Sequence, residues 1–188
     1  MAGRSLFFLI GTACVAGFIA SGSTATVSVG PIPEFAELTL GATQTDAIAA
    51  MSKHVSRPNV GHVCNGEYGV SAHVPYRDQS WQLMAHIHDG TVDEIRLFRS
   101  TRNEIDTHAD CRTAFETVLS EWQGRSDLKN WSVDTGVLNS EKAFAASATA
   151  IGADRIAYTL TADRSVRNRA LCALELIFTE APTAALVR

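Results

Sequence analysis

The segment "YGVSAHVPYRDQSWQLMAHIHDG", residues 68–90, is the most informative about the fold, because apolar and polar residues alternate along two parts of it. Alternation with a period of two is typical of antiparallel strands that bury one face. If Val74 pairs with Trp81, the alternating apolar residues of both strands fall on one face, with Met84 on the other, whereas a slip by one residue would separate them. The sequence therefore predicts a hairpin in this register, with an apolar face made of Tyr68, Val70, Ala72, Val74, Trp81, Leu83, Ala85 and Ile87.

The pair Asp89-Gly90 ends this stretch and predicts a second tight turn. Both central residues of a type I′ turn need a positive φ, which glycine and aspartate tolerate. The turn leads into a third predicted strand, residues 91–100, in which Val92 has the core-facing parity but Ile95 has the opposite one. An extra residue at Asp93 or Glu94 would restore the apolar face, so we expect a β-bulge there.

Two helices are predicted beside these strands. The first begins at Thr43, with Asp46 in the position of a capping-box acid, and its apolar residues Ile48, Met51 and Val55 recur at helical spacing. The second begins at Thr107 and ends before Gly124, and it carries a longer apolar stripe. That stripe consists of Cys111, Ala114, Phe115, Val118, Leu119 and Trp122.

The C-terminal third predicts strands at residues 142–151, 155–162 and 170–178. The first of them is rich in alanine, so a helix is the alternative there. We expect an α+β fold, in which two amphipathic helices pack on one antiparallel sheet. Two halves of helix followed by strands, residues 37–100 and 105–180, are one arrangement of this fold.

The N-terminus has the pattern of a secretory signal. An uncharged run, residues 6–20, follows Arg4, and Ser23 and Ala25 satisfy the small-residue rule for cleavage. The run is short for a bilayer-spanning helix, although an uncleaved anchor and lipidation of Cys14 are alternatives. We predict a signal peptide at 1–25, a linker at 26–36, a single domain at 37–180 and a flexible tail at 181–188. The mature protein would be periplasmic or secreted, with no stable membrane span.

Charge and motifs exclude several classes of function. The 16 basic and 20 acidic residues form no basic stripe, which disfavours nucleic acid as a partner. The sequence has no nucleophile elbow, no zinc-protease helix motif and no glycine-rich phosphate loop. We therefore predict a non-enzymatic protein without a cofactor, and a hydrolase with a dispersed site is the alternative.

Three cysteines remain after the predicted cleavage: Cys64, Cys111 and Cys172. In an oxidising compartment they predict one disulfide and one free thiol. Cys172 lies in an apolar strand, where a buried thiol is comfortable. By elimination we predict a Cys64–Cys111 disulfide.

Histidines and carboxylates on the polar side of the hairpin indicate a metal site as an alternative function. In the predicted register Glu67 lies opposite His88, and His86 faces Asp93 across the turn. Imidazole and carboxylate groups are ligands for zinc or copper. The alternative is an ordinary solvated sheet face. A periplasmic metal-binding protein that uses His86, His88 and Glu67 is therefore our second hypothesis.

The segment "ELTLGATQTDAIAAM", residues 37–51, resembles the opening of small envelope domains of the SmpA/OmlA and beta-lactamase-inhibitor-protein type. In these domains a Leu-x-x-Gly-Met-Thr-like phrase starts a helix that packs on an antiparallel sheet. Leu40, Gly41, Thr43 and Asp46 match the phrase, whereas Ala42 stands where methionine is usual. The segment "DGTVDEI" resembles the hairpin that often follows, so the likeness covers about residues 37–98.

This resemblance implies an envelope adaptor or inhibitor, and it carries over no catalytic residues. Our leading hypothesis is accordingly an exported protein that binds another envelope or extracellular protein, whose identity the sequence does not indicate.

Overall fold

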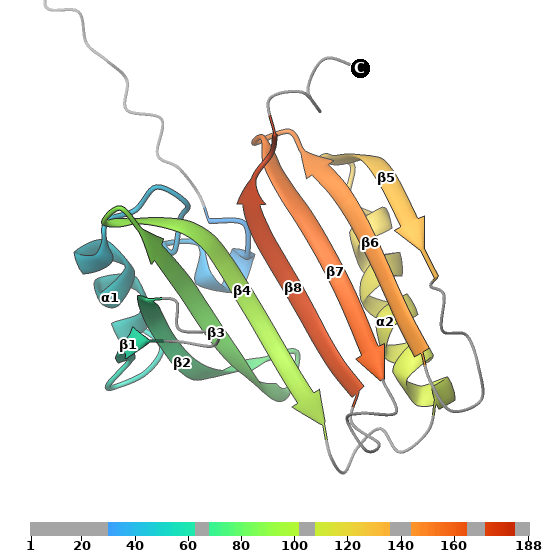
Figure 1. The fold of residues 1–188 in the computed structure, drawn as a ribbon, viewed down its shortest axis with the longest axis horizontal. Helices are drawn as coiled ribbons and strands as arrows, with labels where there is room; N and C mark the ends of the chain where they lie inside the picture. The colour runs from blue at the N-terminus through green and yellow to red at the C-terminus, as the bar shows by residue number, and fades with distance from the viewer. Residues whose placement is uncertain (1–29, 63–67, 102–107, 136–143, 165–171, 183–188) are drawn as a thin grey trace, which may run out of the picture.

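A computed structural model describes residues 30–62, 68–101, 108–135, 144–164 and 172–182 (Figure 1). The first elements are a 3₁₀ turn η1 (Pro33–Phe35) and a helix α1 (Gln44–Ser52). The strands β1 (Asn59–His62), β2 (Tyr68–Tyr76), β3 (Gln79–His88) and β4 (Thr91–Thr101) follow. The second series is α2 (His108–Gln123), β5 (Leu128–Asp134), β6 (Phe144–Gly152), β7 (Ile156–Arg164) and β8 (Cys172–Glu180).

The strands form one eight-stranded sheet in the order β1-β2-β3-β4-β8-β7-β6-β5, and every neighbouring pair is antiparallel. Each half of the sheet follows its own helix in the chain, and the last strands of the two halves, β4 and β8, pair at the centre. The predicted α+β class is confirmed, with far more strand than helix. The alanine-rich segment is the strand β6, and β1 was not predicted.

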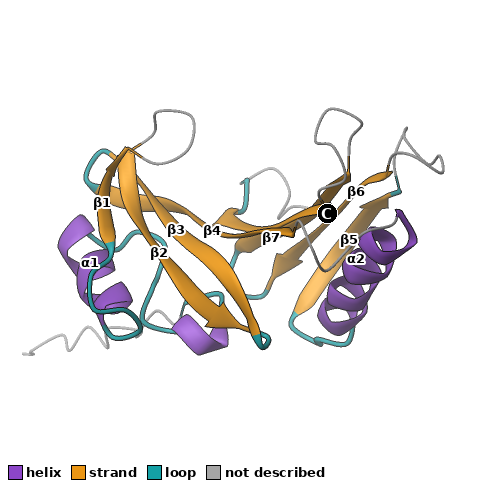
Figure 2. Ribbon diagram, turned by 90° about the horizontal axis from the view of Figure 1, so that it is seen from below, coloured by secondary structure: helices purple, strands orange, loops and turns teal. Residues whose placement is uncertain are grey.

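The two helices contact different parts of the sheet. Helix α1 contacts β2 and β4, and α2 contacts β6 and β7. Figure 2 shows both helices below the sheet, on the same side of it. Among the residues that the structure describes, no helix lies on the other side.

The predicted hairpin register is confirmed, because Val74 pairs with Trp81 and the apolar residues that precede and follow them pair in step. The connecting turn consists of Arg77 and Asp78, both with positive φ, at 53° and 59°. The second turn is also as predicted, since Asp89 has φ 48° and Gly90 has φ 82°.

The β-bulge between β3 and β4 is confirmed as well. His86 pairs with Glu94 and Ile87 pairs with Val92, so Asp93 is the extra residue. The bulge returns Ile95 to the face of Val92, and both side chains are buried. Register and bulge together bring the apolar residues of three strands into one core.

The N-terminus of α1 has the predicted cap. The Thr43 side chain accepts a hydrogen bond from the Asp46 amide at 3.2 Å and donates one to the Asp46 carboxylate at 2.7 Å. The buried residues of α1 are Ala47, Ala50 and Met51, while Ile48 is only partly buried. The core-facing stripe is therefore rotated slightly from the predicted one.

The stripe of α2 is as predicted. Phe115, Val118 and Trp122 are buried, and Ala114 and Leu119 pack partly against the core. The predicted N-cap residue Thr107 lies outside the described residues.

Residues 30–36, the described part of the predicted linker, pack against the core. Ile32 and Phe35 are buried, and the Phe35 ring lies 4.8 Å from the His54 ring and 6.2 Å from the Tyr76 ring. Burial of an aromatic side chain is favourable enough to order a proline-containing segment.

Near the C-terminal end of the described residues, the amide of Ala181 donates a hydrogen bond to the Arg155 carbonyl at 2.8 Å.

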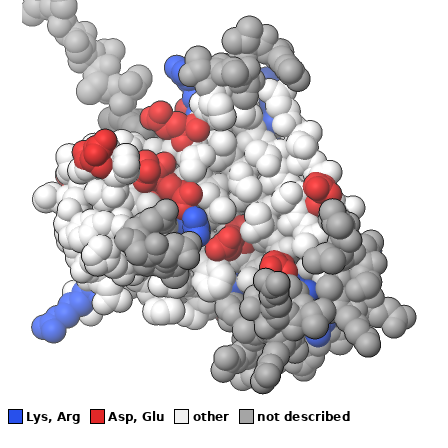
Figure 3. All heavy atoms as spheres, viewed as in Figure 1, with Lys and Arg blue, Asp and Glu red and all other residues white. Residues whose placement is uncertain are grey.

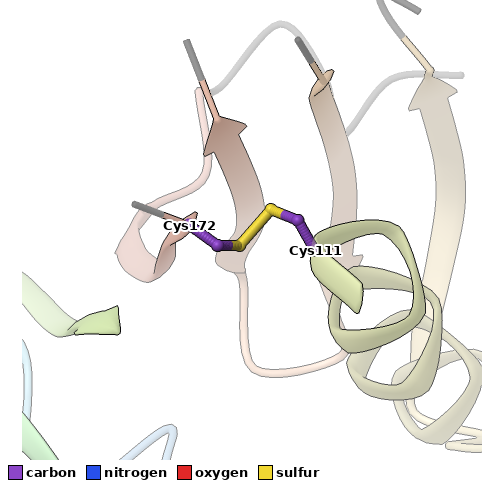
Figure 4. The surroundings of a disulfide bond; sticks show 2 residues. All are labelled: Cys111 and Cys172. Atoms are coloured by element: carbon purple, nitrogen blue, oxygen red, sulfur yellow. A yellow bond between two sulfur atoms is a disulfide. The ribbon is translucent and has the colours of Figure 1, made fainter. Parts of the chain in front are cut away.

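The predicted Cys64–Cys111 disulfide is wrong, because Cys111 is bonded to Cys172 (Figure 4). Their Cα atoms are 5.6 Å apart, and both residues are buried. Cys111 lies on the core-facing stripe of α2, and Cys172 begins β8 next to β7, which α2 contacts. An apolar environment suits a disulfide as well as a thiol, so elimination chose the wrong pair. Cys64 lies outside the described residues.

Candidate functional site: the open face of the sheet

The candidate site is the side of the sheet that faces away from α1 and α2, which we call the open face. Successive side chains of a strand point to opposite sides, and the strand registers therefore assign each residue to a face. The open face carries Ser71, His73, Gln82, Met84, His86, Glu94, Arg96, Phe98, Ala145, Ser147, Thr149, Ile151, Ala157, Thr159, Thr161, Asp163, Ala173, Glu175, Ile177 and Thr179.

The open face is ordered in rows that cross the strands. One row runs from Thr149 through Thr159 and Ile177 to Arg96 and Met84. Four of these side chains are partly exposed and Met84 is buried, and the row passes from two hydroxyl groups to apolar and charged groups. Strand pairing on both sides of each residue holds the backbone in place, so the face presents these groups in a fixed pattern.

A cluster of four polar side chains occupies the middle of the open face, and we call His86, Glu94, Arg96 and Glu175 the central cluster. Arg96 donates to Glu94 Oε1 from Nε at 3.0 Å and from Nη2 at 2.7 Å. Its Nη1 lies 3.6 Å from Glu175 Oε1, and His86 Nε2 lies 3.5 Å from Glu94 Oε1.

The side chains of Glu94, Arg96 and Glu175 are 22%, 18% and 28% exposed, so these three are partly buried, whereas His86 is buried.

The register explains how the central cluster forms. Glu94 and Arg96 are two residues apart on β4, and His86 is the pairing partner of Glu94 on β3. Ile177 on β8 is the pairing partner of Arg96, and Glu175 lies two residues before it in the chain, on the same face of the sheet. The cluster therefore joins both halves of the sheet.

The two described residues of the predicted metal site, His86 and His88, differ in their exposure to solvent. His86 is buried at 5% exposure, whereas the His88 side chain is 76% exposed and lies 3.5 Å from Asp89. Glu67 lies outside the described residues. The two histidines line a hollow of about 170 Å³ beside Asp93 and Glu94. Within the described residues, no group of three or more histidine, cysteine or acidic side chains is arranged to hold a metal ion.

The predicted pairing of His86 with Asp93 is wrong, because Asp93 is the bulged residue and Glu94 takes its place opposite His86. Sequence reasoning missed Glu94, Arg96 and Glu175 as a group. The bulge, which was predicted at Asp93 or Glu94, would have placed Glu94 and Arg96 on the face of His86. The position of Glu175 beside Arg96 depends on the pairing of β4 with β8.

The helix-bearing side of the molecule has a different electrostatic character, because several of its acids lie close to basic side chains. Lys53 and Glu37 are 3.0 Å apart, and Arg125 and Asp127 are 2.6 Å apart. The hydrogen bond from Lys53 lowers the pKa of Glu37, and that from Arg125 lowers the pKa of Asp127. These exposed pairs neutralise one another and contribute little to stability.

A groove on the helix-bearing side is a second concave feature. It has a volume of about 430 Å³ and lies between α2 and the sheet, with Trp81, Arg99 and Leu174 in its floor. The Arg99 guanidinium lies 5.8 Å from the centre of the Trp81 ring. Arg77 and Glu121, which form an ion pair, also line it. Its basic and acidic groups are balanced, so the groove has no evident preference for a charged ligand.

Within the described residues, no helix is long and apolar enough to cross a membrane. Comparison of the chain with models of protein families, with curated proteins and with solved structures gave no match. The resemblance of residues 37–98 to SmpA/OmlA and beta-lactamase-inhibitor-protein domains accordingly stays a prediction.

Proposed function

We propose that this chain is an exported, non-enzymatic protein whose open face binds another envelope or extracellular protein. The observation that carries the proposal is the one-sided placement of α1 and α2. It leaves an eight-stranded face of mixed apolar and polar side chains that no described element covers (Figure 2). An antiparallel sheet often has one solvated face, and apolar groups among polar ones give such a face the mixed composition found at protein interfaces.

The dimensions of the open face suit a protein partner. Eight strands spaced by ~4.8 Å span about 34 Å, and a nine-residue strand such as β7 is about 30 Å long. The product is about 1,000 Å², and a stable protein interface needs about 800 Å² from each partner. The rigid rows of side chains also reduce the entropy lost on binding, because few of them have to be ordered.

Two further features support export. Residues 1–25 have the pattern of a secretory signal, and the Cys111–Cys172 disulfide is of a kind typical of oxidising compartments. The resemblance of residues 37–98 to envelope domains implies the same location and the role of an adaptor or inhibitor. A periplasmic or secreted protein-binding module accounts for all of these features.

Site-specific photo-crosslinking tests the proposal. A photoreactive amino acid is placed at Thr159, in the middle of the open face, and in a matched protein at Glu116, which is exposed on α2. Each protein is irradiated in an envelope or culture extract of the producing cells. We expect one crosslinked species of defined mass from Thr159 and none from Glu116. Equal products from both positions, or none from Thr159, would contradict a function of the open face.

A pair of substitutions sharpens this test. Thr159→Arg places a long charged side chain among the hydroxyl groups of the open face, and Glu116→Arg makes a comparable change on α2. We expect the first to reduce the yield of a crosslinker at Ile177, one row neighbour away, by about tenfold, which corresponds to the loss of a well-packed contact. The second should leave the yield unchanged.

A further inference from the structure

The indole group of Trp81 is a buried hydrogen-bond donor without an acceptor in the described part of the chain. Trp81 is only 1% exposed, so its Nε1–H is also withdrawn from bulk water. A buried tryptophan N–H usually has a partner, because a donor that has lost water without gaining an acceptor costs free energy. The neighbouring groups do not supply one. The Tyr76 ring makes an edge contact at 5.5 Å, and the Arg99 guanidinium, which has donors only, lies 5.8 Å from the ring centre.

Trp81 also lies in the floor of the groove between α2 and the sheet. The volume of this groove, about 430 Å³, is within the range of about 300–1,000 Å³ that is typical of small-molecule sites. Leu174 of β8 adds an apolar group to the floor, and Ala114 and Val118 of α2 add apolar groups to the wall. The donor that lacks an acceptor therefore belongs to a residue that lines a concave site of ligand size.

The charged side chains of the groove favour an uncharged ligand. Arg77 and Glu121, which both line it, form an ion pair, and the two other charged residues of the lining, Arg99 and Asp110, have opposite signs. A charged ligand would lose hydration in the groove without a net charge to attract it. Figure 3 shows the opposite side of the molecule, the open face, where acidic side chains outnumber basic ones. The groove and the open face thus differ in the chemistry that they offer.

Access to the indole nitrogen requires a small adjustment of the groove, because the nitrogen is buried. Arg99 is the residue best suited to give way, since its guanidinium lies over the Trp81 ring and its side chain is partly exposed. Partly exposed side chains change rotamer within nanoseconds. An acceptor that enters in this way satisfies the N–H, and the free energy that the unbonded donor costs the free protein is then regained in the complex.

We infer that the groove binds a small, uncharged and mainly apolar molecule whose carbonyl or ether oxygen accepts a hydrogen bond from Trp81 Nε1. Apolar groups that bury most of a ligand, together with a few polar groups that orient it, are the usual composition of such a site. The inference concerns the side of the sheet opposite to the open face, and it goes beyond the proposed function without resting on it.

The ketone benzylacetone is a probe with the inferred chemistry, and hydrocinnamate, which has a carboxylate in place of the methyl ketone, is its charged counterpart. The mature protein, isotopically labelled, is titrated with each and followed by NMR. We expect millimolar ketone to move the indole N–H signal of Trp81 to higher frequency, because hydrogen bonding deshields the proton. The signals of Trp122 and Trp131 should not move. Hydrocinnamate should bind about fivefold more weakly, because it loses more hydration.

Two substitutions on α2 locate the site. Thr117→Phe places a ring in the groove, whereas Glu116→Phe places the same ring on an exposed position of α2 that does not line the groove. We expect the first to lower the affinity for benzylacetone about tenfold, the loss of one well-packed contact, and the second to leave it unchanged. The backbone amide of Val118 reports the affinity, and thermal unfolding verifies that both proteins are folded.

Replacement of Trp81 by benzothienylalanine tests the hydrogen bond itself, because this residue has sulfur in the position of the N–H and nearly the same shape. We expect the affinity for benzylacetone, measured at the Val118 amide, to fall about fivefold, as for the loss of one hydrogen bond. Thermal unfolding again verifies the fold.

Three results would overturn the inference. Absence of shifts at millimolar ketone, or the same affinity in the Thr117→Phe protein, would exclude the groove as the site. An unchanged affinity in the benzothienylalanine protein would exclude Trp81 as the donor, and tighter binding of hydrocinnamate would exclude an uncharged ligand. None of these results bears on crosslinking from Thr159, which lies on the open face, so the proposed function is tested separately.

Discussion

The two halves of the molecule have the same order of elements but are stabilised differently. In each half a helix precedes four antiparallel strands, and the halves meet where β4 pairs with β8. The first half holds a nine-residue helix with a side-chain cap, small buried residues and the η1 segment. The second half holds a sixteen-residue helix with a disulfide to β8. The same topology thus holds its helix on the sheet in two ways, by small buried residues in the first half and by a disulfide in the second.

Aromatic rings pack in both halves, but the cluster of Phe35, Tyr76 and Trp81 in the first half contains no residue of α1, whereas α2 contributes a ring to the cluster of the second half. In the second half the ring of Trp122 lies 5.8 Å from that of Tyr158 and 6.0 Å from that of Phe178, and the last two rings are 5.3 Å apart. In the first half the equivalent position under α1 is filled by Ala47, Ala50 and Met51. We therefore expect the second half to be the more stable one, and four measurements test that expectation.

The largest effect is expected from removal of the disulfide. It closes a loop of 61 residues, and the loss of that constraint on the unfolded chain predicts a destabilisation of about 4 kcal/mol. Urea unfolding of a Cys111→Ala/Cys172→Ala protein measures it. Wild-type protein in dithiothreitol should unfold near the same urea concentration. If reduction leaves the midpoint unchanged, the second half does not depend on the disulfide.

The next largest effect is expected from Met51→Ala in the first half. Met51 is fully buried, and truncation of such a side chain costs about 3 kcal/mol. Hydrogen exchange should show faster opening of β2 than of β7, because α1 contacts β2 and α2 contacts β7. The exposed Lys53→Ala substitution, which breaks the ion pair with Glu37, is the control and should cost under ~1 kcal/mol. Uniformly faster exchange in both halves would show that they open as one unit.

The hairpin turns predict smaller effects of opposite sign. Gly90 in the first half has φ 82°, so Gly90→Ala should destabilise the protein by about 1 kcal/mol, although nothing lies within 4 Å of the added methyl group. Arg155 in the second half has φ 65°, so Arg155→Gly should relieve strain and stabilise the protein by about 0.5 kcal/mol. Thermal unfolding measures both. Effects of the same sign would mean that backbone conformation does not control these turns.

The smallest effect at neutral pH is expected from Tyr158, whose hydroxyl group donates to Asp154 at 3.0 Å. Burial, and then the nearby charge of Asp154, raises the pKa of Tyr158 to about 12 from its usual value of 10. The folded protein thus holds this proton more tightly than the unfolded chain, and stability must fall as the pH rises from about 10 to 12. Tyr158→Phe should flatten that part of the stability–pH curve. An unchanged slope would assign the alkaline loss to other groups.

Local patterns were sufficient for the hairpins and helices. The register of β2 and β3, the turn at Gly90 and the bulge at Asp93 were all predicted correctly, because each depends on neighbouring residues. The cap at Thr43 and the stripe of α2 are local in the same sense. By contrast, the predicted disulfide partner of Cys111 was wrong, since the correct partner depends on which strand pairs with β7.

The sequence is sufficient to predict most of the strands and helices and the apolar side of each, because periodicity and turn chemistry act over a few residues. The pairing of β4 with β8 is a property of the tertiary structure, and it brings Glu175 to Arg96 in the central cluster. The placement of both helices on one side, which leaves the open face without a described covering element, is a tertiary property as well (Figure 2). The order of strands in a sheet is selected by the packing of the whole core, which no local pattern encodes.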